Sequence, residues 1–225
     1  MFPFVMHILK SKFVKSNIMS FSVEDLEEQK KFRLFLTIPY TNLIQFVFDY
    51  LKKNSLLTFF FWFVCFFFLS TSIIIRIKIA GIFPLTNILL HSVIGFIILP
   101  LICIPLHEFL HIIPYFLSGA KNIRVGMDLK QYLFYVSAHK YVASPLQFRI
   151  VALTPFLVIS SGLIILIILL PGLWKWSLSV FLFVHATMCA GDFALLNMYF
   201  VNKDKKIYTW DDLDKKEAYF YEELS

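Results

Sequence analysis

The chain has 225 residues, of which 59% are hydrophobic and 16% are charged. About a quarter of the residues of a soluble domain are charged, so this composition indicates a membrane protein and leaves no room for a separate soluble enzyme domain. The net charge of +6 does not indicate a nucleic-acid-binding patch, because the basic residues stand at the ends of apolar runs, as membrane topology requires. We therefore expect the lipid bilayer as a partner and no nucleic acid.

The first segment, residues 1–54, is expected to be cytoplasmic. Within it, Leu34–Phe48 is uncharged but only 15 residues long, and Pro39 interrupts it. This length is short for a membrane span, so the stretch is predicted to form an interfacial or re-entrant helix. A fifth span at this position stays open.

Four later stretches are long enough to cross a bilayer, which takes about 20 apolar residues in a helix. They are Leu56–Ile75, Leu85–Leu117, Ile150–Leu170 and Ser177–Val201. The predicted fold is an all-α integral membrane bundle of four transmembrane helices over residues 55–202, followed by a charged cytoplasmic tail over residues 203–225.

The loop between the second and third spans, residues 119–147, has strand character. Ile123–Asp128 alternates polar and apolar residues, and Tyr132–Ala138 is rich in residues that favour strands. This loop, called the inner loop below, is predicted to contain a short β-hairpin.

The distribution of lysine and arginine predicts the orientation. With both termini in the cytoplasm, 18 basic residues lie inside and three lie outside. We expect a multi-pass protein of the cell membrane in which Lys130 and Ser225 are cytoplasmic and Lys175 is external.

One motif inside the second span carries the functional argument: His107-Glu108-Phe109-Leu110-His111. Two histidines at positions i and i+4 share a helix face and can bind one zinc ion, while the glutamate acts as general base toward the attacking water. Glu108 is the only acidic residue between Asp49 and Asp128, and an ionisable residue inside a membrane span indicates a functional site. The motif predicts zinc as cofactor, His107 and His111 as ligands and Glu108 as catalytic base.

A third protein ligand is expected, and Asp192 is the best candidate. It is the only acidic residue between Asp128 and Asp204, and it lies about two-thirds along the fourth span, as His107 does along the parallel second span. His185 stands two turns earlier, about 10 Å away along a straight helix, and fits less well. His139, in the inner loop, is the reserve ligand.

This combination resembles a family of bacterial multi-pass membrane proteins described as "putative zincin peptidases", and its motif is similar to that of site-2-protease-like intramembrane zinc proteases. The resemblance covers about residues 85–201 and rests on the histidine motif, the inner loop and the Gly191-Asp192 pair. It implies a zinc ion held by His107, His111 and Asp192, with Glu108 as the base. Site-2 proteases place their aspartate in an Asn-Pro-x-Asp-Gly-like setting, and this chain departs from that pattern with Cys-Ala-Gly-Asp-Phe around Asp192.

The sequence therefore predicts a membrane-embedded zinc metallopeptidase that hydrolyses membrane or juxtamembrane protein or peptide substrates. Two alternatives stay open: a zinc hydrolase that acts on a non-peptide substrate, and a non-catalytic metal-binding membrane scaffold. The sequence names neither the substrate nor the oligomeric state.

Overall fold

The computed structural model describes residues 21–28, 30–128 and 133–224, so Lys130 and Ser225 lie outside the described residues. The helical elements are α2 (Val23–Glu27), the 3-10 turn η1 (Tyr40–Asn42), α3 (Leu43–Leu51), α4 (Leu56–Ile79), α5 (Leu85–Val93), the π-helical turn η2 (Ile94–Ile98), α6 (Leu99–Leu117), α7 (Pro145–Leu169), α8 (Leu173–Met188) and α9 (Ala190–Val201). The strands are β1 (Phe32–Pro39), β2 (Ile123–Asp128), β3 (Leu133–Ala138), β4 (Ile207–Asp212) and β5 (Glu217–Glu223).

Three of the four predicted spans correspond to single helices in the described residues. The helix α4, the continuous helix Leu85–Leu117 and α7 are each long and apolar enough to cross a membrane. The fourth predicted span is not one straight helix, because α8 and α9 meet at an angle of 44°. There are four candidate spans only if this bent pair counts as one.

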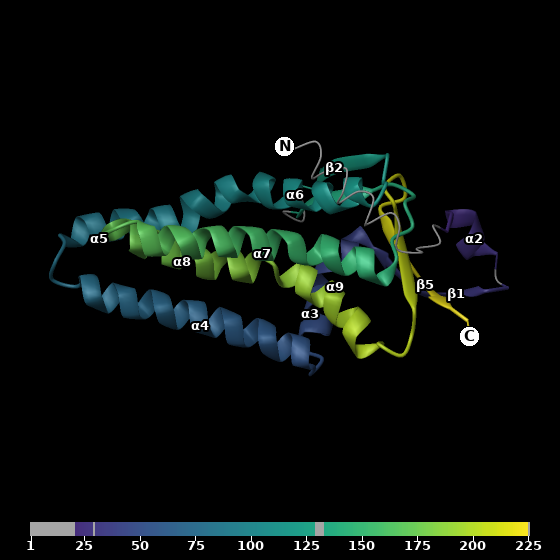
Figure 1. Ribbon diagram of the computed structural model, residues 1–225, viewed down its shortest axis with the longest axis horizontal. Coiled ribbons are helices and arrows are strands. Elements are labelled where there is room, and N and C mark those ends of the chain that lie inside the picture. Colours follow the sequence, from purple (N-terminus) through teal and green to yellow (C-terminus); the bar gives the residue numbers. More distant parts are fainter. Residues whose placement is uncertain (1–20, 29, 129–132, 225) are drawn as a thin grey trace, which may run out of the picture.

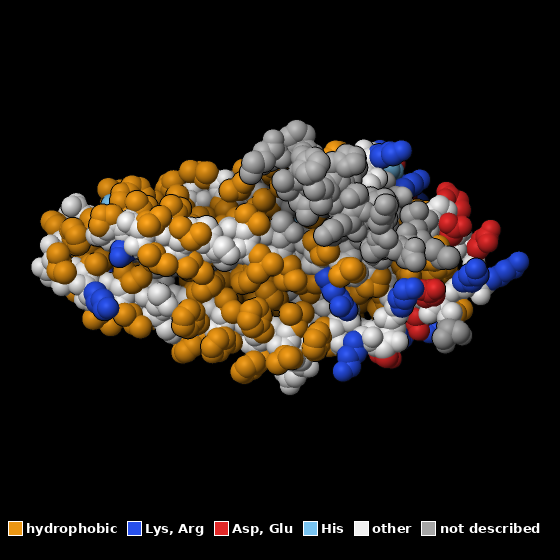
Figure 2. Space-filling view, viewed as in Figure 1, with side chains coloured by type: hydrophobic (Ala, Val, Ile, Leu, Met, Phe, Trp, Pro, Cys, Tyr) orange, Lys and Arg blue, Asp and Glu red, His pale blue; other side chains and the backbone are white. Residues whose placement is uncertain are grey.

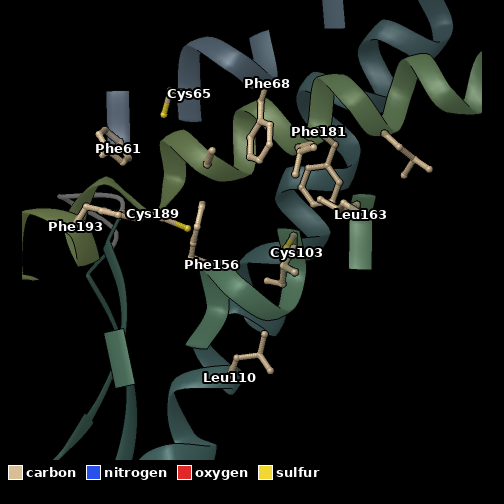
Figure 3. Packing of buried hydrophobic residues seen from close by; sticks show 14 residues of the cluster. Phe61, Cys65, Phe68, Cys103, Leu110, Phe156, Leu163, Phe181, Cys189 and Phe193 are labelled. Atoms are coloured by element: carbon tan, nitrogen blue, oxygen red, sulfur yellow. The ribbon is translucent and has the colours of Figure 1, made fainter. Parts of the chain in front are cut away.

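The long helices lie side by side along the long axis of the molecule (Figure 1). Helix α8 contacts α4, α5 and α7, and α7 in turn contacts α6. Buried aromatic and sulfur-containing side chains fill the space between these helices (Figure 3). Among them are Phe61 and Cys65 of α4, Phe156 of α7, Cys189 at the bend and Phe193 of α9. The many close van der Waals contacts among these side chains hold the helices of the bundle together.

Gly95 allows a close approach between the second helix and α8. It lies in η2, and a Cβ atom at this position would stand 2.5 Å from the carbonyl oxygen of Ser177. Because no side chain fits between the two backbones, glycine is required for η2 and α8 to pack at this distance.

The predicted helical bundle with one short hairpin is correct only in part, because strands form two antiparallel sheets at one end of the bundle and the larger sheet was not predicted. The larger sheet has the order β1-β5-β4, and β1 pairs with β5 from Phe32↔Glu223 to Pro39↔Glu217. The predicted interfacial helix Leu34–Phe48 is therefore half strand: its first residues belong to β1, and only its second half is helical, in η1 and α3. Pairing with a segment far away in the sequence overrides the local apolar pattern.

The predicted hairpin in the inner loop is confirmed. Strands β2 and β3 pair from Ile123↔Ala138 to Asp128↔Leu133. The segment after β3 also reaches the larger sheet, through the isolated bridges His139↔Asp211 and Ala143↔Thr209. Strand β1 of the N-terminal segment, the inner loop, and the C-terminal hairpin formed by β4 and β5 thus meet at one end of the bundle.

The surface follows the same division (Figure 2). Hydrophobic side chains cover the visible face of the helices, and most of the visible charged side chains gather at the end that carries α2, β1 and β5. Several large side chains of α4 point outward, namely Phe59, Trp62, Phe63, Phe66 and Phe67.

Candidate metal centre

The two histidines of the motif lie on the same face of α6 and are both buried, with 7% of His107 and 8% of His111 exposed. Their ring centroids are 5.1 Å apart. This is the arrangement expected of residues one turn apart on a helix.

Asp192 faces both imidazoles. It lies in the first turn of α9, directly after the bend that separates α9 from α8. Its Oδ2 atom is 3.3 Å from Nε2 of His107, and its Oδ1 atom is 3.6 Å from Nε2 of His111. The structure thus brings together the three residues that the sequence proposed as ligands.

A proline in α7 explains the orientation of His111. Nδ1 of His111 lies 3.0 Å from the carbonyl oxygen of Val151, so this nitrogen carries the proton and donates it. In a regular helix the Val151 carbonyl accepts from the residue four positions later, but that residue is Pro155, which has no N–H group. The carbonyl is therefore free to fix the tautomer of His111 and to leave the Nε2 lone pair facing Asp192.

These three residues fit zinc. Neutral imidazole nitrogens and a carboxylate oxygen are donors that zinc prefers, and bonds of about 2.0–2.1 Å in a tetrahedral site place the donors about 3.3–3.5 Å apart. The distances of 3.3 and 3.6 Å from Asp192 to the two imidazoles match this spacing, and the closest donor atoms of all three residues lie within 4.8 Å of one another. The second nitrogen of His107, Nδ1, is buried and has no hydrogen-bond partner among the described residues, so the structure explains the tautomer of His111 but not that of His107.

Glu108 lines a cavity of about 270 Å³ together with His107, His111 and Asp192. Val136, in the middle of β3, lines the same cavity. A carboxyl group beside the three donors and open to the same cavity can exchange protons with a molecule bound there.

His139, the reserve ligand, lies in a different environment. Its Nδ1 atom accepts the backbone N–H of Leu213, and its Nε2 atom lies 3.5 Å from Asp214. These contacts explain His139 as a connection between the inner loop and the C-terminal hairpin.

His185 lies closer to His107 than a straight fourth span allows. The ring centroids of these two histidines are 5.7 Å apart, and the donor atoms of His107, His185 and Cys189 lie within 4.8 Å of one another. The expected separation of about 10 Å along one helix axis does not apply, because the chain bends between His185 and Asp192.

Several polar residues that line the same cavity were not predicted from the sequence. Ser137 of β3, Asp211 of β4 and Tyr40 of η1 are among them. The hydroxyl group of Ser137 donates a hydrogen bond to the Asp211 carboxylate. Asp211 belongs to the sheet that was not predicted, and Tyr40 directly follows its strand β1, so no local signal in the sequence places them near His107.

Comparison with known proteins finds a family whose model matches part of the chain. Residues 100–208 match the family described as "Putative zincin peptidase". No curated protein and no solved structure matches the chain significantly. The matched segment contains the complete His-Glu-x-x-His motif, β2 and β3, and Asp192. This match confirms the resemblance stated from the motif, and the segment 100–208 is similar to the family described as "Putative zincin peptidase".

Proposed function

We propose that the protein is a membrane-embedded zinc metallopeptidase, in which His107, His111 and Asp192 hold zinc and Glu108 is the catalytic base. The observation that carries this proposal is the Asp192 carboxylate, which faces Nε2 of both histidines beside the cavity that Glu108 lines. Zinc in such a site supplies a Lewis acid that polarises a substrate carbonyl and makes water more acidic.

Residues of the chain would carry out proton transfer and hold the site in position. Glu108 takes a proton from the attacking water and returns it to the nitrogen of the leaving amine. The carbonyl of Val151 holds His111 in the orientation that it needs. Glu108 and Val136 line the same cavity, which places the base beside β3.

Strand β3 offers a place for an extended substrate. Among the described residues, β3 pairs with β2 only, and Phe134–Ser137 line the cavity next to Glu108. A peptide added as a further strand beside β3 would present an extended amide to the base.

Two observations support the membrane location. The exposed aromatic side chains of α4 form a surface that suits lipid better than water. The three segments that hold 18 of the 21 basic residues all reach the same end of the bundle, as expected if this end is cytoplasmic.

The test compares the native chain with Glu108→Gln, both purified and reconstituted in lipid vesicles, on a mixed peptide library read by mass spectrometry. The native chain should cleave peptides only when zinc is present. Glu108→Gln should keep its zinc, and its rate of peptide cleavage should be about 10²–10⁴-fold lower. Cleavage at an equal rate by Glu108→Gln would contradict the role of Glu108. Bound zinc without cleavage of any peptide would favour the non-catalytic scaffold or a non-peptide substrate.

A further inference from the structure

A third carboxylate lies in the cavity and has no role in the proposed chemistry. Asp211 of β4 lines the cavity together with Glu108 and Asp192. Its carboxylate accepts a hydrogen bond from the hydroxyl of Ser137. In the described part of the chain, no Lys, Arg or His side chain forms an ion pair with it.

The surroundings of Asp211 disfavour an isolated negative charge. Burial raises the pKa of Asp211 to about 6, although the hydrogen bond from Ser137 acts in the opposite direction. A buried carboxylate without a counter-charge is costly, and a cation bound next to it removes this cost.

Three tyrosines line the same cavity as Asp211. Tyr40, Tyr115 and Tyr135 line the cavity, and the rings of Tyr40 and Tyr135 meet edge to face at 5.0 Å. Aromatic rings combined with a carboxylate are the groups with which proteins bind ammonium and guanidinium ions.

Tyr115 connects this corner of the cavity with the candidate metal centre. It lies one helical turn after His111 on α6, and it lines the same cavity as Asp192 and Asp211. Since the cavity measures only about 270 Å³, a ligand next to Asp211 lies within a few side-chain lengths of Glu108.

We propose that Asp211, together with the tyrosines that line the same cavity, is a subsite for a positively charged nitrogen group of the substrate. The proposal rests on the proposed peptidase function and adds the substrate class: a peptide that brings an ammonium or guanidinium group into the cavity. The group comes either from a lysine or arginine side chain or from a free N-terminal amine.

The test measures peptide binding to the full-length Glu108→Gln variant in lipid nanodiscs with zinc, so that bound peptides are not cleaved. The first set of probes consists of nine-residue alanine peptides that are blocked at both ends and carry one lysine, whose position changes from peptide to peptide. In the second set, the neutral isostere norleucine replaces the lysine. A third set has norleucine and a free N-terminus, which separates the two sources of the charge. We expect one lysine position or the free amine to improve affinity at least about tenfold over the neutral blocked peptide.

The same probes are then measured with Asp211→Asn in the Glu108→Gln background, where the preference should disappear. The matched control is Asp214→Asn, which removes the same charge from the same hairpin but at a solvent-exposed position, and which should keep the preference. If Asp211→Asn does not fold, Asp211→Ser provides the same neutral replacement.

The inference is overturned if no charged peptide binds better than its neutral counterpart, or if the preference survives the loss of the Asp211 charge. A purely structural role, in which Asp211 only connects β4 to Ser137 of β3, gives this second result. Digestion of the same peptides by the native chain separates the two proposals. If charged peptides bind better but none is cleaved, the subsite is supported and the peptidase activity is contradicted. If peptides are cleaved but charged ones bind no better, the peptidase activity is supported and the subsite is contradicted.

Discussion

At the scale of single residues, the candidate metal centre depends on a backbone carbonyl that lacks a helical donor. Pro155 leaves the carbonyl of Val151 free, and this carbonyl orients His111. Hydrogen bonds of this kind to a ligating histidine typically contribute 10–100-fold to metal affinity.

We therefore expect Pro155→Ala to weaken zinc binding by up to about tenfold, because the restored N–H group competes with His111 for the Val151 carbonyl. Competition with a chelator on the purified protein measures the affinity. The control is Thr154→Ala, which removes a side-chain hydrogen bond to the neighbouring carbonyl of Ile150 and should leave zinc affinity unchanged. Equal affinities in the native chain and in Pro155→Ala would show that this carbonyl does not orient the ligand.

At the scale of elements, the position of Asp192 depends on the bend between α8 and α9, and α8 itself is held against the second helix at Gly95. We expect Gly95→Ala to lower the free energy of unfolding by about 1–3 kcal/mol, because the added Cβ meets the Ser177 carbonyl. Thermal unfolding in detergent measures the change.

Gly162→Ala is the matched control. Gly162 lies in the interior of α7, and a Cβ atom added there meets nothing within 4 Å. Replacing glycine by alanine in an unobstructed helix raises stability by about 0.5–1 kcal/mol. If both variants unfold at the same temperature, the close approach at Gly95 does not limit packing.

The elements also show why the sequence predicts some parts of the site and misses others. His107 and His111 are one turn apart on one helix, so local periodicity is enough to place them together. Asp192 is distant in the sequence, but a lone carboxylate in an apolar run is a strong signal in itself. Asp211 carries no such signal, since its strand reaches the cavity through pairing with β5, which also binds β1 from the opposite end of the chain. The bend that brings His185 near His107 cannot be predicted from the sequence either, because no proline stands between α8 and α9 to mark it.

At the scale of the whole molecule, the positions of the basic residues and the strands predict that the sheet end is cytoplasmic. Labelling of single cysteines in intact cells tests this orientation, and a cysteine at Asp214 should be protected from an impermeant thiol reagent, whereas one at Lys175 should react. The native cysteines Cys65, Cys103 and Cys189 are all buried, which keeps the background low. Labelling at Asp214 but not at Lys175 would invert the topology.

The metal content of the purified chain tests the central claim most directly. We predict about one zinc per chain by elemental analysis, its loss in the double variant His107→Ala and His111→Ala, and a reduced content in Asp192→Asn, because an amide oxygen is a weaker ligand than a carboxylate. Glu108→Gln and His139→Ala should keep their zinc. The account is contradicted if the folded native chain binds no zinc, or if Asp192→Asn retains all of it while His139→Ala or His185→Ala loses it.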